Sequence, residues 1–438
     1  MNRKWIGFSA ILVGMSASAI MQTLVATSMP AITRDLGGME LYTWVFSAYM
    51  LASTITIPLF ARLADIFGRR ILYTSGMIVF LLGSALIGGA SSMGGLVACR
   101  ALQGIGAGAV APAGLASIGD LFDENKRGKM FGVIGAVQVL ANLIGPPLGG
   151  WVTDTYSWRM GFYLVLPLGL IALALASFGL HGKTQVSAAS LRLDWFGAAV
   201  IGLGLSAGLV GFQFFGAENI TSGAIALLVS VALLAFAAHW ENRQPDPVIP
   251  MPMLNVPAMW KPVLGTLLLG LATNSAVAYF PLYLQNIFNE TATQTGFALL
   301  PILLTAGIAS GAGGTLATRY PHQTQTWAWL LVTAGFSLLT IFHTQNILLM
   351  AAFIGAGLGL LLPVYLHLAQ QTGGEKHLAT ASGLIQMARN MGGAMGIPLL
   401  GAWLAFGEAN INSFIAIFAS LAVVGVLGLS LGFTLKKS

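Results

Sequence analysis

Apolar runs long enough to cross a membrane recur from one end of this chain to the other, and they constrain its fold more than any other feature. A transmembrane helix needs about 20 apolar residues to cross roughly 30 Å of hydrocarbon. The 438 residues are 56% hydrophobic and 8% charged, whereas soluble domains carry about 25% charged residues. The sequence therefore predicts an all-α integral membrane protein with no sizeable globular domain.

The positions of the apolar runs predict about fourteen transmembrane helices. We place them at residues 5–26, 43–62, 71–90, 95–117, 129–151, 160–180, 194–214, 221–240, 262–286, 295–317, 326–343, 347–370, 380–404 and 411–433. The first run is too long and too rich in polar residues for a signal peptide and lacks a small-residue cleavage site, so we expect it to stay in the membrane. An even number of helices puts both termini on the same side.

Positive charge is distributed unequally between the two sides that this span count predicts. Cytoplasmic loops carry an excess of Lys and Arg. Only Arg34 and Arg159 lie on one side, and we therefore expect the other side, with both termini, to be cytoplasmic. Sixteen of the 20 Lys and Arg residues lie there: Arg3, Lys4, Arg62, Arg69, Arg70, Lys126, Arg127, Lys129, Lys183, Arg192, Arg243, Lys261, Arg319, Lys376, Lys436 and Lys437.

Short patterns recur in the two halves of the chain at similar offsets, as expected for a transporter built from a duplicated bundle. Pro30 is expected to end the first helix. The recurrences are IGAG at 105–108 and 354–357, Gln138 and Asn142 with Gln386 and Asn390, Pro30 with Pro281, and LADIFGRR at 63–70 with a shorter LATRY at 316–320, at offsets of 249, 248, 251 and 253 residues.

The repeat divides the chain into three parts. Residues 1–184 form an N-terminal six-helix bundle, residues 185–245 an inserted pair of helices, and residues 246–438 a linker with a C-terminal six-helix bundle. The connector ENRQPDPVIPMPMLNVPAMW at 241–260 contains five prolines, which disfavour helix and suit an extended linker. We therefore expect two pseudo-symmetric bundles with a helix pair inserted between them.

Polar side chains inside the predicted helices are the first candidates for a binding site, because such groups are costly in hydrocarbon and usually face the bundle interior or a water-filled cavity. Residues four apart share a helix face. Gln138 with Asn142, and Gln386 with Asn390, therefore each present two amides in one direction. Both pairs either line a central cavity or form hydrogen bonds that hold the bundle together.

Two arginines and one histidine lie within the predicted helices. Arg100 is expected to have a structural or conformational role near the substrate path. Arg389 lies closer to the cytoplasmic end, where the alternative is that its side chain extends along the helix to the headgroups. His367, with Tyr365, lies near the inner end of a helix and is a candidate for proton movement, because histidine titrates near neutral pH. The alternative for His367 is a hydrogen-bonded structural residue.

No catalytic, nucleotide-binding or metal-binding pattern is present. The sequence has no GxxxxGK[ST] loop, no HExxH and no cluster of Cys, His and carboxylates at ligand spacing. The single cysteine, Cys99, excludes a disulfide framework. The basic residues form no patch with interleaved aromatics, which argues against nucleic acid binding. We expect no enzyme activity and no cofactor.

Several segments, in order, resemble signature motifs of the major facilitator superfamily. The segment ARLADIFGRR at 61–70 resembles the loop between the second and third helices, and RALQGIGAG at 100–108 the fourth-helix motif. ANLIGPPLGG at 141–150 resembles the antiporter motif of the fifth helix. Residues 280–301 and 381–396 resemble second-half signatures of the fourteen-helix drug:proton antiporters. The resemblance covers nearly the whole chain and implies the major facilitator fold in a bacterial inner membrane.

The resemblance also implies a cytoplasmic gate. Asp65 would meet the N-terminal end of the helix at 380–404, where the helix dipole favours an anion. Arg69 would form an ion pair with Asp120. Proline removes a backbone donor, so the antiporter motif would bend the fifth helix and give it a close packing surface. The residues with these expected gating roles are Asp65, Gly68, Arg69, Asp120, Gly145, Pro146, Gly149 and Gly150.

One residue departs from the family pattern. Residues 20–30 read IMQTLVATSMP, with Met21 where related antiporters commonly carry an Asp. The fourteen acidic residues of the chain all lie in loops or near helix ends of the predicted topology. With no buried carboxylate to gain and lose a proton, coupling to a proton gradient is in doubt.

The sequence therefore predicts a monomeric secondary transporter, a multidrug or metabolite exporter that works by alternating access among membrane lipids. Its substrate is expected to be small and amphipathic or weakly polar, with protons as a candidate second partner. The alternatives are a facilitator and a ligand sensor on a transporter fold. The expected cavity residues are Met21, Gln22, Thr23, Arg100, Gln103, Gln138, Asn142, Asn274, Tyr279, Tyr283, Gln285, Gln386 and Asn390.

Overall fold

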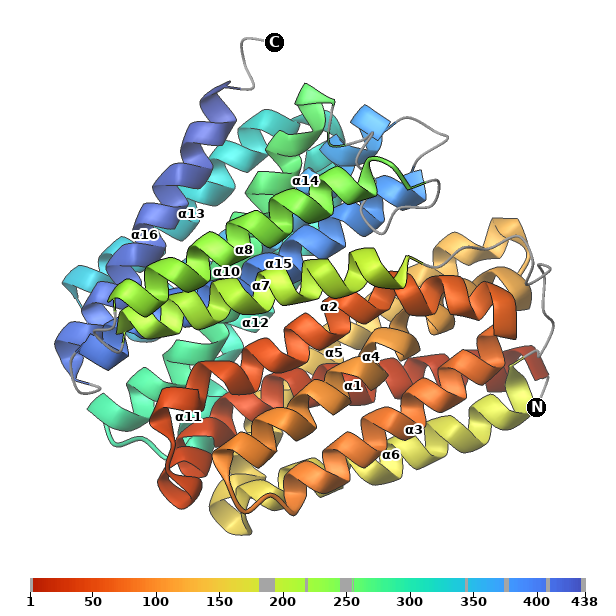
Figure 1. Ribbon diagram of the computed structural model, residues 1–438, viewed down its shortest axis with the longest axis horizontal. Helices are drawn as coiled ribbons and strands as arrows, with labels where there is room; N and C mark the ends of the chain where they lie inside the picture. Colours follow the sequence, from red (N-terminus) through yellow and green to blue (C-terminus); the bar gives the residue numbers. More distant parts are fainter. Residues whose placement is uncertain are drawn as a thin grey trace. The chain divides into compact units, whose positions relative to one another are not determined.

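A computed structural model describes residues 3–180, 194–216, 220–244, 254, 256–342, 346–373, 378–406 and 410–434. Every regular element within these ranges is a helix (Figure 1). The helices are α1 (Arg3–Leu36), the 3-10 turn η1 (Met39–Leu41), α2 (Tyr42–Phe67), α3 (Arg69–Gly88), α4 (Met93–Leu121), α5 (Glu124–Thr155), α6 (Trp158–Gly179), α7 (Trp195–Gly216), α8 (Ile220–Glu241), α10 (Pro257–Ile287), α11 (Ala292–Ala298), α12 (Leu300–Arg319), α13 (Pro321–Ile341), α14 (Ile347–Gly373), α15 (Leu378–Phe406) and α16 (Ile411–Thr434).

The all-α membrane architecture is confirmed, since a helix covers each predicted span, with α11 and α12 together covering the tenth. Ten spans in the described part of the chain are long and apolar enough to cross a membrane. The predicted end of the first helix at Pro30 is wrong, because α1 continues to Leu36 with Pro30 inside it. Proline removes a single helical hydrogen bond, and neighbouring helices make such a loss tolerable within a membrane.

The chain divides into two compact units. Unit 1 contains Met1–Gly202 and Thr291–Phe297, and unit 2 contains Leu203–Glu290 and Ala298–Ser438. The domain boundaries predicted from the repeat stay a prediction. Within unit 2, α7 and α8 are joined by a hydrogen bond of 2.7 Å from the hydroxyl of Ser230 to the carbonyl oxygen of Gly204.

The same helix pairings occur in both units. In unit 1, α4 packs against α1, α2 and α3, while α6 packs against α1 and α3, and α1 packs against α5. In unit 2, α14 packs against α10, α12 and α13, while α16 packs against α10 and α13, and α10 packs against α15. Each contact in the first set has a counterpart in the second, which is the arrangement that the internal repeat predicts.

Glycines on α4 and α14 set the register of this repeat. A Cβ atom on Gly104 would overlap the carbonyl oxygen of Tyr49 on α2, and one on Gly106 would overlap the backbone of Phe80 on α3. Gly355 and Gly357 meet the carbonyl oxygens of Ile302 on α12 and Ala328 on α13 in the same way. The structural offset between α4 and α14 is thus 251 residues, and the match of 105–108 with 354–357 is two residues out of register.

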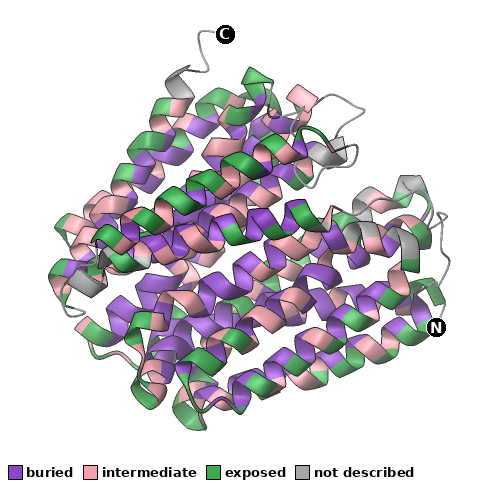
Figure 2. Ribbon diagram, viewed as in Figure 1, coloured by how far each residue is buried: buried purple, intermediate pink, exposed green. Residues whose placement is uncertain are grey.

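The outward faces of the helices are apolar, as lipid contact requires. On α3, the side chains of Ile78, Leu82 and Leu86 repeat every four residues and are 48%, 54% and 53% exposed. Buried residues such as Tyr73 and Phe80 occupy the other face of α3. Buried and exposed stretches alternate along the helices in Figure 2. Each such helix therefore carries one stripe for lipid and one for its neighbours.

We predict that Gly106→Ala lowers the apparent unfolding temperature of the purified protein. The added methyl meets backbone atoms of Phe80 and Gly76, which cannot move aside as a side chain can, and overpacking of this kind costs about 1–3 kcal/mol. Gly132→Ala on α5 is the matched control, because nothing lies within 4 Å of its Cβ position. Thermal unfolding in detergent measures both, and equal behaviour of the two variants would contradict the packing argument.

Candidate functional site

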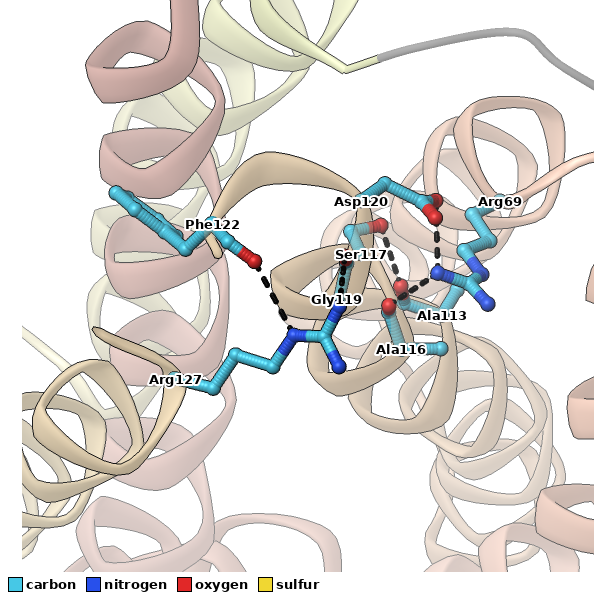
Figure 3. A network of polar contacts seen from close by, with 8 residues as sticks. All are labelled: Arg69, Ala113, Ala116, Ser117, Gly119, Asp120, Phe122 and Arg127. Atoms are coloured by element: carbon cyan, nitrogen blue, oxygen red, sulfur yellow. Dashed lines mark hydrogen bonds and ion pairs between the residues drawn. The ribbon is translucent and has the colours of Figure 1, made fainter. Parts of the chain in front are cut away.

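The C-terminal end of α4 carries a network of polar contacts that includes the predicted gate pair. The guanidinium of Arg69, at the start of α3, lies 2.7 Å from the carboxylate of Asp120. The same nitrogen donates a hydrogen bond to the carbonyl oxygen of Ala116, one turn earlier on α4 (Figure 3). The predicted ion pair is confirmed as a contact, and its gating role stays a prediction.

A second arginine reaches the same helix end from α5, and sequence reasoning assigned it only to membrane orientation. Arg127 donates to the carbonyl oxygens of Phe122 at 3.1 Å and Gly119 at 2.9 Å. The last carbonyls of a helix lack partners within the helix, and a cation there also interacts favourably with the helix dipole. Arg127 therefore caps α4, on the side opposite Arg69 in Figure 3.

The junction between α2 and α3 requires a glycine. Gly68 separates the two helices and has a φ of 90°, a backbone conformation that side chains with a Cβ rarely adopt. This turn places Arg69 directly at the start of α3. The side chain of Asp65 lies outside the described residues, so its contact with α15 stays a prediction.

The polar residues of α1 are largely used in packing against α5. Thr23 is 7% exposed, and its hydroxyl lies where a Cβ on Gly145 would be. Thr27 donates to the carbonyl oxygen of Leu24 at 2.9 Å and lies 3.4 Å from that of Pro146 on α5. The antiporter motif thus supplies a close packing surface for α1, as the resemblance implied for Gly145 and Pro146.

The same interface continues along both helices. The side chain of Leu24 on α1 packs against Gly149 of α5. The hydroxyl of Ser28 lies 2.8 Å from that of Thr153. Met21 is fully buried, whereas Gln22 is exposed. A cavity role for Met21, Gln22 and Thr23 stays a prediction.

Arg100 and Gln103 form a buried network inside unit 1. The guanidinium of Arg100 donates to the carbonyl oxygen of Val45 at 3.0 Å and to the side-chain oxygen of Gln103, and it lies 4.3 Å from the ring centre of Tyr49. Gln103 in turn donates to Ser84 at 2.6 Å. The charge of Arg100 is therefore held by α2 and α4, in agreement with the expected structural role.

The C-terminal end of α5 makes a contact that the sequence did not reveal. The carboxylate of Asp154 accepts hydrogen bonds from the backbone amides of Ala292 at 3.2 Å and Thr293 at 2.7 Å, and from the hydroxyl of Thr293 at 2.6 Å. A Cβ on Gly150 would overlap the carbonyl oxygen of Ala292. Asp154 therefore caps the first turn of α11, where a negative charge is favourable.

The two amide pairs lie on half-buried positions of α5 and α15. The side-chain nitrogen of Gln386 donates to the side-chain oxygen of Asn390 at 3.2 Å, so this pair shares a face as predicted. Gln138 and Asn142 are also half-buried. The cavity role of all four residues stays a prediction.

The contacts between helices show that Gln138 and Asn142 are not the structural counterparts of Gln386 and Asn390. The predicted match of the two pairs is one residue out of register. Gly145 meets the backbone of Ile20, and Gly392 meets that of Leu267 in the same way. Gly392 follows Gly145, and Leu267 follows Ile20, by 247 residues, so this is the structural offset between the two helix pairs. Asn142 therefore corresponds to Arg389.

The four predicted cavity residues of α10 differ in their surroundings. Asn274 donates to the carbonyl oxygen of Gly270 in its own helix at 2.9 Å. Tyr279 is buried and donates to the carbonyl oxygen of Ile397 on α15. Tyr283 packs in an aromatic cluster, with its ring centre 5.1 Å from that of Phe418. Gln285 is 4% exposed. The substrate contacts of these residues stay predictions.

The acids whose side chains the structure describes all lie in loops or within the last two residues of a helix: Asp35, Glu40, Asp120, Asp123, Asp154, Asp194, Glu241 and Glu290. For these eight, the predicted placement is confirmed. Burial raises the pKa of Glu290, between α10 and α11. His367 lies on α14, and its Nε2 is buried with no hydrogen-bond partner among the described residues.

Comparisons with known proteins agree with this architecture. The sequence matches the family model described as Major Facilitator Superfamily over residues 11–397 and 263–437. Multidrug transporter protein MdtP of Bacillus subtilis strain 168 is 33% identical over 94% of this chain and 77% of its own length. Multidrug resistance protein 3 of the same strain is 33% identical over 70% of this chain and 60% of its own length. The crystal structure of an auto-inhibited POT family peptide transporter shares the fold, with a TM-score of 0.72 at 14% identity over 100% of this chain and 97% of the other.

We predict that Arg69→Ala and Asp120→Ala each lower the apparent unfolding temperature of the purified protein. Arg69 loses both the ion pair and the bond to Ala116, and a partly exposed ion pair contributes about 1 kcal/mol or less. The shift of the double variant should be smaller than the sum of the two single shifts, because the ion pair is lost only once. Strictly additive shifts in thermal unfolding would contradict this coupling.

We predict that Asp154→Asn speeds hydrogen exchange of the backbone amides of Ala292 and Thr293. Hydrogen bonds to a charged acceptor contribute about 1.5–3 kcal/mol, and partial exposure of Asp154 lowers this, so we expect an increase of about tenfold. Thr293→Val is the matched control, since it removes the hydroxyl bond and keeps both amide bonds. Mass spectrometry of the peptide containing residues 291–297 measures the effect, and unchanged exchange in Asp154→Asn would show that the carboxylate does not hold α11.

Proposed function

Because the chain belongs to the Major Facilitator Superfamily, we propose that it exports small amphipathic or weakly polar molecules from a bacterium across the cytoplasmic membrane. Two relatives that are 33% identical to it carry the names of multidrug transport and resistance proteins. The chain spans 77% and 60% of their lengths. The protein is a multi-pass membrane transporter, and its substrates, its direction of transport and its coupling belong to this proposal.

The doubled helix packing is the observation that carries the proposal. Two units with matching pairings, α1 with α5 and α10 with α15 for example, are what alternating access requires, because the two halves must move as bodies around a binding site. Close backbone contacts within each unit favour rigid units. We place the termini in the cytoplasm from the distribution of Lys and Arg, and we propose a monomer.

Polar contacts at both ends of α5 are candidates for the gates that open and close when the two halves move. Arg127 near its start holds the end of α4, and Asp154 near its end holds the first turn of α11. The two residues are about 40 Å apart along the helix axis. We propose that the contacts around Arg69, Asp120 and Arg127 belong to the inner gate and those around Asp154 to the outer one.

Transport without coupling to protons is the second candidate mechanism, and the placement of the acids favours it. None of the acids with described side chains lies in the middle of a helix, and Met21 occupies the position of the usual carboxylate. His367 is the alternative carrier of a proton, because its Nε2 is buried and lacks a partner among the described residues. A ligand sensor on the same fold is the remaining alternative.

The uncoupled mechanism predicts that purified protein in proteoliposomes moves fluorescent amphipathic dyes down their gradient, while an imposed pH gradient does not drive their accumulation. The physical reason is the lack of a mid-membrane carboxylate that could gain and lose a proton in each cycle. Dye flux across liposomes with and without protein measures the effect. Accumulation driven by the pH gradient would overturn the uncoupled mechanism.

His367→Ala is the companion variant for this experiment. If the flux of the wild type depends on pH and that of His367→Ala depends on it equally, His367 is not the proton carrier. Dye binding without any flux would support the ligand sensor instead.

A further inference from the structure

Arg100 and Arg389 are the charged side chains that the structure describes in the middle of helices, and their surroundings differ. Arg100 is 1% exposed and is held by Val45, Gln103 and Tyr49. Arg389 is half-buried, and within the described part of the chain its guanidinium takes part in no hydrogen bond, ion pair or ring contact. Among the described residues, the guanidinium of Arg100 thus has partners and that of Arg389 has none.

The depth of Arg389 in its helix argues against a simple extension to the headgroups. It is the twelfth residue of α15, which begins at Leu378, so its Cα lies about 17 Å along the axis from the first residue. An arginine side chain is too short to cover that distance. A charge at such a depth is costly unless another group pairs with it.

The neighbours of Arg389 on α15 are hydrogen-bonding groups. Gln386 lies three residues before it, so the two side chains share a helix face, and Gln386 is hydrogen bonded to Asn390. All three are half-buried. In the repeat, Arg389 corresponds to Asn142, another half-buried polar side chain. The backbone of Arg389 meets Gly270 on α10, and Gly392 and Gly396 pack against the same helix. The contact between the two helices therefore uses the backbone of Arg389 and leaves its guanidinium without a partner among the described residues.

No acid with a described side chain lies in the middle of a helix to pair with this cation. The counter-charge must then come from outside the described side chains. We infer that Arg389 binds the carboxylate of a transported amphipathic anion, with the amides of Gln386 and Asn390 beside it as further donors. The planar guanidinium matches a carboxylate with two parallel hydrogen bonds. This inference rests on the proposed function, since it names the substrate class of the same transporter.

A matched pair of probes isolates the charge. N-dansyl-phenylalanine carries a carboxylate, and its amide has the same skeleton without the charge; dansylcadaverine supplies a cation. Binding of each to the full chain in phosphatidylcholine nanodiscs is followed by dansyl fluorescence. We expect the wild type to bind the carboxylate about tenfold more tightly than the amide, the gain of one charge-assisted hydrogen bond.

Three variants complete the experiment. Arg389→Gln should bind the carboxylate and the amide equally, whereas Arg389→Lys, which keeps the charge, should retain a preference for the carboxylate. Arg319→Gln is the control, because it removes the same charge from an exposed position at the end of α12, and it should behave as the wild type. If Arg389→Gln fails to fold, the wild type and Arg389→Lys still test the inference, because both should bind the carboxylate more tightly than the amide.

The inference is overturned if the wild type binds the amide or the cation as tightly as the carboxylate, or if Arg389→Gln keeps the preference. Flux of neutral dyes in proteoliposomes of the same protein would leave the proposed function standing in that case. Absence of binding for all three probes also overturns the inference. The proposed function is tested separately, and it fails if the proteoliposomes show no dye flux.

Discussion

Direct contact between helix backbones is the constraint on which the rest of this structure depends. Lipid is as apolar as a leucine side chain, so burial of apolar surface does not drive helices together within a membrane, and packing at close range must do so. Gly104 and Gly106 bring α4 against α2 and α3, and Gly355 and Gly357 do the same for α14. Each unit is thereby built around one glycine-lined helix.

This constraint also explains how polar side chains are distributed. Thr23 and Thr27 face α5 at the glycines and proline of the antiporter motif, so their hydroxyls serve the contact between α1 and α5. The network of Arg100, Gln103 and Ser84 joins α3 and α4 by hydrogen bonds. Arg389, by contrast, packs against Gly270 of α10 through its backbone, while its guanidinium has no partner among the described residues. Polar groups that packing does not use are those left for a ligand.

Much of the fold could be predicted from the sequence, because hydropathy over about 20 residues fixes the helices and their number. The contact of Arg69 with Asp120 could be predicted from a motif. The contact of Asp154 with Thr293 could not, because the two residues are far apart in the chain and neither belongs to a recognised pattern. Arg127 was assigned to membrane orientation, since a cation at a helix start satisfies that rule whether or not it also caps a neighbouring helix.

The errors of prediction have physical causes as well. Pro30 is a helix breaker in water, yet α1 passes through it because the surrounding helices support the backbone. The register of the repeat was misplaced by two residues at IGAG because glycines recur at every second position there, and only the carbonyls that they meet identify the true counterparts. The site residues of α10 and α15 belong to one unit and those of α1 and α5 to the other, so their joint role in one cavity is part of the proposal.

Distances between spin labels on the two units test the central claim of alternating access most directly. In a Cys99→Ser background, one pair of labels replaces the exposed residues Phe67 and His322, at the end of α2 and the start of α13. A second pair replaces Tyr156, directly after α5, and Leu348, at the start of α14. Alternating access predicts two distance populations for each pair, and a transported molecule should shift the two pairs in opposite senses. A single population in each pair that no transported molecule changes would contradict the account.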